Sequence, residues 1–150
     1  MSLDGAYDEG NPFALILAGK LPAARIWEDE HVLAFMDVFP QAEGHALVIS
    51  KTSRARNMLE MEPDALCRVM AAARRVAIAI RAALAPEGIQ IMQTNGAAAG
   101  QTVFHLHVHV IPRAPGSGIG FVAGGYKGGM ADQAELQALA ARIAAHLPGA

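Results

Sequence analysis

The stretch that most constrains the fold is 105–110, HLHVHV, which places a histidine at every second position. Alternation with a period of two is typical of a β-strand, in which successive side chains point to opposite faces of the sheet. His105, His107 and His109 are therefore expected on one face of a strand, with a leucine and two valines on the other. We expect the apolar face to pack against a helix, which leaves the histidine face available for chemistry.

The longest predicted helix covers residues 63–85, where apolar side chains recur at the three-and-four spacing of one buried stripe. Pro63 suits its first turn, and Pro86 with Gly88 stops the chain from continuing as helix. The elements together predict an α+β domain: about five strands in a mostly antiparallel sheet, one long inserted helix and a C-terminal helix. The other predicted helices are 12–18 and 132–147, and the predicted strands are 24–29, 31–38, 44–51, 88–94 and 102–111. The predicted stripe of the long helix is Leu66, Val69, Met70, Ala73, Val76, Ala77, Ile80 and Leu84.

The length of 150 residues predicts a single domain with a sizeable core, and 53% apolar with 17% charged residues predicts an ordered chain. Residues 1–11 are acidic and are expected to form a loose leader. Residues 114–131 are rich in glycine and are expected to form a flexible loop.

The charge balance excludes some classes of partner. Twelve basic residues against fourteen acidic ones give a formal charge of −2, whereas a nucleic-acid-binding surface needs a basic excess. No stretch approaches the roughly 20 apolar residues of a membrane span. The single cysteine, Cys67, excludes an internal disulfide and suits a reducing compartment, so a cytoplasmic location is expected.

Three interpretations of the histidine face compete. The first is a half-exposed strand that carries histidines by chance. The second is a metal site, since two histidines on one strand can share a zinc ion. However, His105 and His109 stand roughly 13 Å apart along a strand, so further ligands would have to come from elsewhere, with His45 as the best candidate.

In the third interpretation, His107 is a nucleophile. A histidine with a pKa near 6.5 presents a neutral, nucleophilic nitrogen at working pH, and flanking rings supply a hydrogen-bond partner and a proton donor. If one nitrogen of His107 donates to a backbone carbonyl or to His45, the other stays unprotonated. Phosphorus is the natural target, because an N-phosphorylated histidine is readily hydrolysed. The preceding loop, 95–100 (NGAAAG), has glycines that let backbone N–H groups approach an anion.

Two blocks of the chain resemble the histidine triad (HIT) family. One is GQTVFHLHVHVIPR, and the other is ARIWEDEHVLAFMDVFPQAEGHALVISK. The likeness covers residues 12 to about 113. It implies the HIT-like fold and a hydrolase that cleaves a nucleoside 5′-phosphate ester, anhydride or phosphoramidate at the α-phosphorus.

The resemblance also implies a role for each site residue. His107 would form a covalent nucleotidyl-histidine, His109 would hydrogen-bond the phosphate or protonate the leaving group, and His105 with His45 would orient the nucleophile. Asp37 would accept hydrogen bonds from the ribose hydroxyls, although it could also cap the turn before Pro40. The implied base slot is Phe13, Ile16, Leu21, Phe35 and Val38, and the implied phosphate contacts are Asn95, Gln101 and Thr102.

The family pattern bears on cofactors, substrates and partners as well. Many relatives hold a structural zinc through a Cys-x-x-Cys pair and a later histidine. Those positions here are NPFALIL without cysteine and SKTSRA without histidine, so neither a metal nor another cofactor is expected. The implied substrate is a purine nucleoside phosphate derivative, either a dinucleoside polyphosphate or an adenosine phosphoramidate, and the implied assembly is a homodimer. A non-catalytic nucleotide-binding or scaffold protein and a His-ligated metalloprotein remain alternatives.

Overall fold

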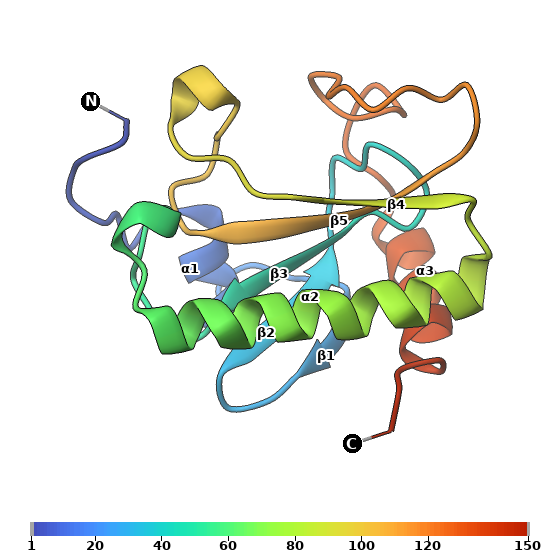
Figure 1. The fold of residues 1–150 in the computed structure, drawn as a ribbon, viewed down its shortest axis with the longest axis horizontal. Helices are drawn as coiled ribbons and strands as arrows, with labels where there is room; N and C mark the ends of the chain where they lie inside the picture. The colour runs from blue at the N-terminus through green and yellow to red at the C-terminus, as the bar shows by residue number, and fades with distance from the viewer. Residues whose placement is uncertain (1, 150) are drawn as a thin grey trace.

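The centre of the molecule is a five-stranded sheet in the order β1-β2-β3-β5-β4, seen in a computed structural model that describes residues 2–149 (Figure 1). All four neighbouring pairs are antiparallel, which confirms the predicted α+β class. The strands are β1 (Arg25–Glu28), β2 (Val32–Met36), β3 (Ala46–Ser50), β4 (Gly88–Met92) and β5 (His107–Arg113). The helices are α1 (Pro12–Leu17), α2 (Pro63–Leu84) and α3 (Gln133–Ala144), with short 3-10 turns η1 (Met58–Glu60) and η2 (Ala97–Ala99).

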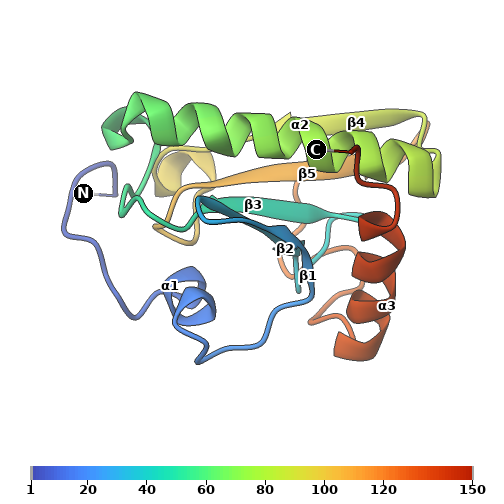
Figure 2. The same cartoon turned by 90° about the horizontal axis from the view of Figure 1, so that it is seen from below.

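The two faces of the sheet carry different residues, and the strand register shows how. His109 lies opposite Leu47 and His107 lies opposite Ile49, so these four side chains share one face. That face packs on α1 in a small cluster of Phe13, Ile16, Leu33, Phe35, Leu47 and Ile49. The other face packs against α2 and α3 in the main core, to which β5 contributes Val108 and Val110. Figure 2 shows α1 and α2 on opposite sides of the sheet.

Helix α2 lies close to the predicted bounds, but its buried stripe is rotated from the predicted one. Val69, Val76 and Ile80 are fully buried as expected, whereas Met70 is 39% exposed. The smaller Ala65, Ala72 and Ala79 take the places against the sheet. Small side chains let the helix approach the strands closely. The apolar periodicity alone did not show that these alanines, and not their larger neighbours, would be buried.

The strand that carries the histidines begins later than predicted. β5 starts at His107 rather than at residue 102, because β3 ends at Ser50 and β4 ends at Met92, which pairs with His109. Residues before His107 therefore have no ladder partner. His105 lies in the connection leading into the strand, where the Leu106 N–H donates to the Ala55 carbonyl.

Two segments expected to be loose make specific contacts. Residues 2–11 contain no helix or strand, yet the Asn57 side chain donates to the Leu3 carbonyl and the Ala97 N–H donates to Ser2. The glycine-rich segment 114–131 also has no helix or strand, and it is hydrogen-bonded to the β2–β3 connection. Within residues 2–149, no helix combines the length and the hydropathy needed to cross a membrane.

Candidate active site

His107 is held with one nitrogen free. Its Nδ1 lies 2.8 Å from the main-chain carbonyl of His105, and a carbonyl can only accept, so Nδ1 carries the proton. Burial lowers the pKa of His107, which keeps the ring neutral at neutral pH. Nε2 is then left with an unshared electron pair, and the ring lines a cavity.

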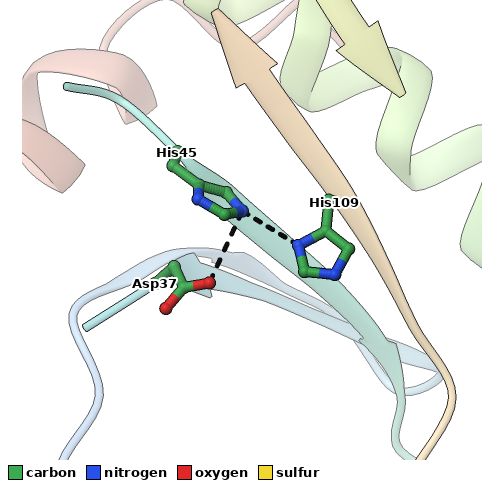
Figure 3. A group of neighbouring side chains, drawn as sticks. All are labelled: Asp37, His45 and His109. Carbon is green, nitrogen blue, oxygen red and sulfur yellow. Dashed lines mark hydrogen bonds and ion pairs between the residues drawn. The ribbon is translucent and has the colours of Figure 1, made fainter. Parts of the chain in front are cut away.

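His45 and His109 form a hydrogen-bonded pair (Figure 3). A neighbouring main-chain group determines which nitrogen of each ring carries the proton. The main-chain N–H of Gln41 donates to His45 Nδ1 over 2.9 Å, so the proton of His45 sits on Nε2. His45 Nε2 lies 2.9 Å from His109 Nδ1, which must therefore accept. The proton of His109 is left on Nε2, on a ring that lines the same cavity as His107.

Burial keeps these rings neutral. It lowers the pKa of His45 to about 2 and that of His109 to about 3, because the charged form of each ring would lose its hydration. Burial raises the pKa of Asp37, whose Oδ2 lies 3.4 Å from His45 Nε2. A neutral imidazole cannot form an ion pair, so Asp37 and His45 are close neighbours without a charge–charge attraction.

His105 supports His107 through the backbone and stays outside the cavity. Its Nε2 donates to the Ser50 carbonyl over 3.2 Å, and its Nδ1 accepts from the Tyr7 hydroxyl over 2.6 Å. Burial lowers the pKa of His105 to about 4. The ring thus fixes the chain at the point where the His105 carbonyl accepts from His107 Nδ1.

The position of His45 depends on the glycine before it. Gly44 has φ of +95°, and a Cβ there would lie 2.5 Å from Leu84 Cδ1 and 3.1 Å from Pro112 Cγ. Any side chain at this position would strain the backbone and displace the side chain of Leu84. Glycine thus lets the chain turn into β3 directly after His45, whose ring lies against His109.

The cavity beside the histidines has a volume of about 450 Å³. One part is apolar, with Phe13, Val38 and Leu47, and another presents His107 and His109. The full lining is Pro12, Phe13, Asp37, Val38, Phe39, Gln41, Leu47, Gly100, Thr102, Val103, His107, His109, Phe121, Val122, Ala123 and Gly124.

The structure brings some of the predicted nucleotide-binding residues to this cavity. Phe13, Val38, Asp37 and Thr102 line it. Asp37 also caps the turn before Pro40, since its Oδ1 accepts from the Phe39 N–H over 2.8 Å. The turn-capping interpretation therefore holds for one oxygen, and the other, Oδ2, faces His45 Nε2.

Other predicted contacts lie elsewhere. Ile16 and Phe35 are buried behind the cavity in the small cluster, and Leu21 is 41% exposed and does not line the cavity. Gln101 is buried and uses its amide on the main chain of Gly96, Arg56 and Val103.

The side chain of Asn95 accepts from the Met58 N–H, so it too stabilises the neighbouring loop. Both amides were predicted from the family resemblance, which does not tell whether an amide in this chain binds a ligand or the loop that carries it.

Sequence reasoning missed several of the cavity residues, among them Leu47, Phe121 and Val122. Leu47 lies two residues after His45 on the same face, so alternation could have found it. Phe121 and Val122 come from the glycine-rich segment, and no local pattern predicts where such a segment packs.

The only candidate metal cluster among residues 2–149 is Asp37, His45 and His109, whose ligand atoms lie within 4.8 Å of one another. A metal needs an unshared electron pair from each ligand. His45 Nε2 carries a proton because Gln41 N–H occupies Nδ1, so this nitrogen cannot coordinate without breaking that bond. The arrangement of these three residues therefore suits hydrogen bonding between the two rings better than coordination of a metal ion.

The chain matches the HIT domain over residues 18–116. A curated relative, protein hit of Bacillus subtilis, is 44% identical over 111 residues, which is 74% of this chain and 75% of that protein.

Three solved structures are also similar. A Hit-like protein involved in cell-cycle regulation from Bartonella henselae has a TM-score of 0.85 at 40% identity, over 95% of this chain and all of that one. A zinc-bound histidine triad family protein from Mycobacterium smegmatis has a TM-score of 0.76 at 35% identity, over 91% and 94%. A histidine triad nucleotide-binding protein from Candida albicans has a TM-score of 0.67 at 26% identity, over 75% and 83%.

Proposed function

The chain belongs to the HIT family, and on that premise we propose that it is a nucleotide hydrolase with His107 as its nucleophile. Family membership supports a nucleotide-binding or hydrolase-type protein. The finer proposal is cleavage of a purine nucleoside 5′-phosphate ester, anhydride or phosphoramidate at the α-phosphorus. The observation that carries it is the bare Nε2 of His107, held by the hydrogen bond from Nδ1 to the His105 carbonyl.

The reaction has two steps. The electron pair of His107 Nε2 forms a bond to phosphorus while the bond to the leaving group breaks, and the leaving group departs with the electron pair of the broken bond. An amine leaves after its nitrogen has taken up a proton from solvent. Water then attacks the nucleotidyl-histidine, which releases the nucleoside monophosphate, returns the electron pair to His107 Nε2 and gives up a proton to solvent. The Nε2–H of His109 supports both steps by donating to a phosphoryl oxygen, a contact that strengthens as charge develops there.

The cavity supports a nucleotide as the occupant. Asp37 offers a carboxylate oxygen to hydroxyl groups, and Phe13 with Leu47 offers an apolar surface to a base. The described lining residues include no lysine or arginine, so the phosphoryl oxygens would rely on neutral donors such as Thr102 and His109. This favours one phosphate at the reacting centre over a chain of bound phosphates.

A His107→Asn variant tests the nucleophile. We expect hydrolysis of a fluorogenic adenosine phosphoramidate and of a dinucleoside polyphosphate to fall by at least about a thousandfold, the range seen when an essential nucleophile is removed. Mass spectrometry of rapidly acidified wild-type protein should show the nucleotidyl adduct. His146→Asn is the matched control, because His146 is exposed beyond α3. Wild-type turnover by His107→Asn would refute the assignment.

The alternative is a nucleotide-binding protein without catalysis. It predicts that adenosine monophosphate binds in the cavity, that Asp37→Asn weakens this binding, and that neither substrate is turned over by the wild-type protein. Binding and turnover measured on one preparation therefore distinguish the two functions.

We further propose that the protein is a homodimer. β4 lies at one edge of the sheet, and its Ile91 is 42% exposed. An apolar edge strand invites pairing with another chain. Light scattering on the purified protein should give twice the mass of the chain, and Ile91→Lys should shift it toward the monomer.

A further inference from the structure

The glycine-rich segment 114–131 is fastened to the connection between β2 and β3. The Tyr126 N–H donates to the Pro40 carbonyl over 2.8 Å, and the Ala131 N–H donates to the Val38 carbonyl over 2.8 Å. Directly before Tyr126, Gly125 approaches so closely that a Cβ would lie 2.6 Å from the Pro40 oxygen. The segment is therefore held in one place beside the cavity in spite of its glycines.

Gln41 adds a second attachment through its side chain. Its Nε2 donates to the Val122 carbonyl over 3.0 Å, and its Oε1 accepts from the Val122 N–H over 2.7 Å. The side-chain amide thus binds both polar groups of one main-chain residue. The main-chain N–H of Gln41 is the group that fixes the proton of His45. One residue links the glycine-rich segment to the histidine pair.

The residue placed by this attachment is Phe121. Its ring centroid lies 5.1 Å from that of His109 with an interplanar angle of 79°, and 6.1 Å from that of His45 at 88°. Further along the cavity, the centroids of His109 and His107 are 4.9 Å apart, and those of His107 and Phe13 are 5.0 Å apart. The two histidines that line the cavity therefore stand between two phenylalanines.

The two ends differ in exposure. Phe13 is 8% exposed and packs on Phe35, whereas Phe121 is 46% exposed and lines the cavity. A ring that is half exposed and edge-on to a buried histidine leaves much of its surface free for a ligand. Val122, 60% exposed, extends this apolar surface.

We propose that Phe121, positioned by Gln41, is the contact surface for the leaving group and that it selects leaving groups with a flat aromatic part. This inference rests on the proposed function: if the base occupies the Phe13 end, the leaving group lies at the Phe121 end. An aromatic leaving group, such as an aryl amine or the base of a second nucleoside, stacks on the exposed ring, and a small one gains nothing from it. Phe121 contacts the leaving group, and Gln41 is a positioning residue.

A pair of substrates tests the aromatic surface. The first is adenosine 5′-monophosphate joined to an indolylethylamine, and the second is the same nucleotide joined to methylamine. We expect Phe121→Ala to lower kcat/KM for the first by about tenfold, mainly through KM, with less than about a twofold change for the second. Phe121→Trp keeps an aromatic ring and should restore the first substrate.

Gln41→Leu tests the attachment. The substitution keeps the main-chain N–H that donates to His45, so the proton arrangement of the histidine pair is retained. It removes both bonds to Val122, and we expect amide hydrogen exchange at Val122 to accelerate by about tenfold or more. It should also reproduce the substrate-dependent loss seen for Phe121→Ala. Gln137→Leu is the matched control, because Gln137 also donates to a main-chain carbonyl, that of Ala23, but lies on α3.

The outcomes separate the two proposals. Equal losses for both substrates in Phe121→Ala, or unchanged exchange in Gln41→Leu, would overturn the inference while leaving hydrolysis by His107 intact. If the wild-type protein hydrolyses neither of these compounds and no dinucleoside polyphosphate, the proposed function fails. Dissociation constants of the same two compounds then decide the inference: Phe121→Ala must weaken only the indolylethyl compound, and equal weakening of both refutes it.

Discussion

Acidification should unfold this protein at a pH where most domains of its size are stable. His45, His105, His107 and His109 are all buried, and burial lowers the pKa of each below the usual value of 6.5. The unfolded chain takes up protons at these histidines near pH 6.5, while the folded chain does not. Because the unfolded state then binds more protons, stability is complete above pH 6.5 and is lost as the pH falls below it.

The size of the loss follows from the number of buried rings. At pH 5.5 a histidine with a pKa of 6.5 favours the unfolded state by about 1.4 kcal/mol. The folded-state pKa values of His45, His109 and His105, about 2, 3 and 4, lie well below this pH. These three rings lose about 4 kcal/mol together, and the lowered pKa of His107 acts in the same direction. The raised pKa of Asp37 acts in the opposite direction at lower pH and offsets part of the loss.

A loss of that size is comparable to the whole stability of many domains, about 5–15 kcal/mol. Urea unfolding at pH 7.5, 6.5 and 5.5, followed by the fluorescence of Trp27, the single tryptophan, measures it directly. His105→Gln should reduce the difference between pH 7.5 and 5.5 by about 1.4 kcal/mol, the contribution of one buried ring. His146→Asn should leave the difference unchanged. A difference below about 1 kcal/mol in the wild-type protein would refute the burial argument.

Two further substitutions probe the segments that hold the site. Tyr7→Phe removes the hydroxyl that donates to His105 Nδ1, leaves a buried acceptor unpaired, and should lower the free energy of unfolding in urea by about 1–2 kcal/mol. Gly125→Ala places a methyl group 2.6 Å from the Pro40 oxygen at a φ of +79°, so the segment must detach; limited proteolysis within 114–131 should accelerate while the thermal midpoint changes by only a few degrees.

The sequence predicted the parts of the fold that depend on periodicity. Alternation at 105–110 was enough to separate a histidine face from an apolar face, and the structure places Val108 and Val110 in the main core as expected. The helix over residues 63–85 was equally well marked. Its stripe was misjudged, because alanines count as weakly apolar in a pattern although they are what a close helix–sheet contact requires.

The parts that depend on pairing and on loop packing could not be predicted. The first residue of β5 is set by where its neighbours β3 and β4 end, and no property of residues 102–106 contains that information. Leu21 is apolar and close to α1 in sequence, but the chain after α1 leaves it 41% exposed. The position of Phe121 could not be predicted either, because it depends on hydrogen bonds made by Gln41, eighty residues earlier in the chain.

The proton positions explain why two similar histidines take different roles. His107 and His109 lie on one strand, two residues apart, and are both buried and neutral. Their hydrogen-bond partners differ. The Nδ1–H of His107 donates to the carbonyl oxygen of His105, whereas Nδ1 of His109 accepts from the Nε2–H of His45. One ring therefore presents an electron pair to the cavity and the other presents a proton.

This arrangement also limits what His109 can do. A second proton on its Nδ1 would face the proton already on His45 Nε2, so the doubly protonated ring is disfavoured by contact as well as by burial. In the proposed mechanism His109 stabilises charge on oxygen and does not supply a proton to the leaving group. Leaving groups that depart readily as anions, or that bring their own proton, are those such a site can expel.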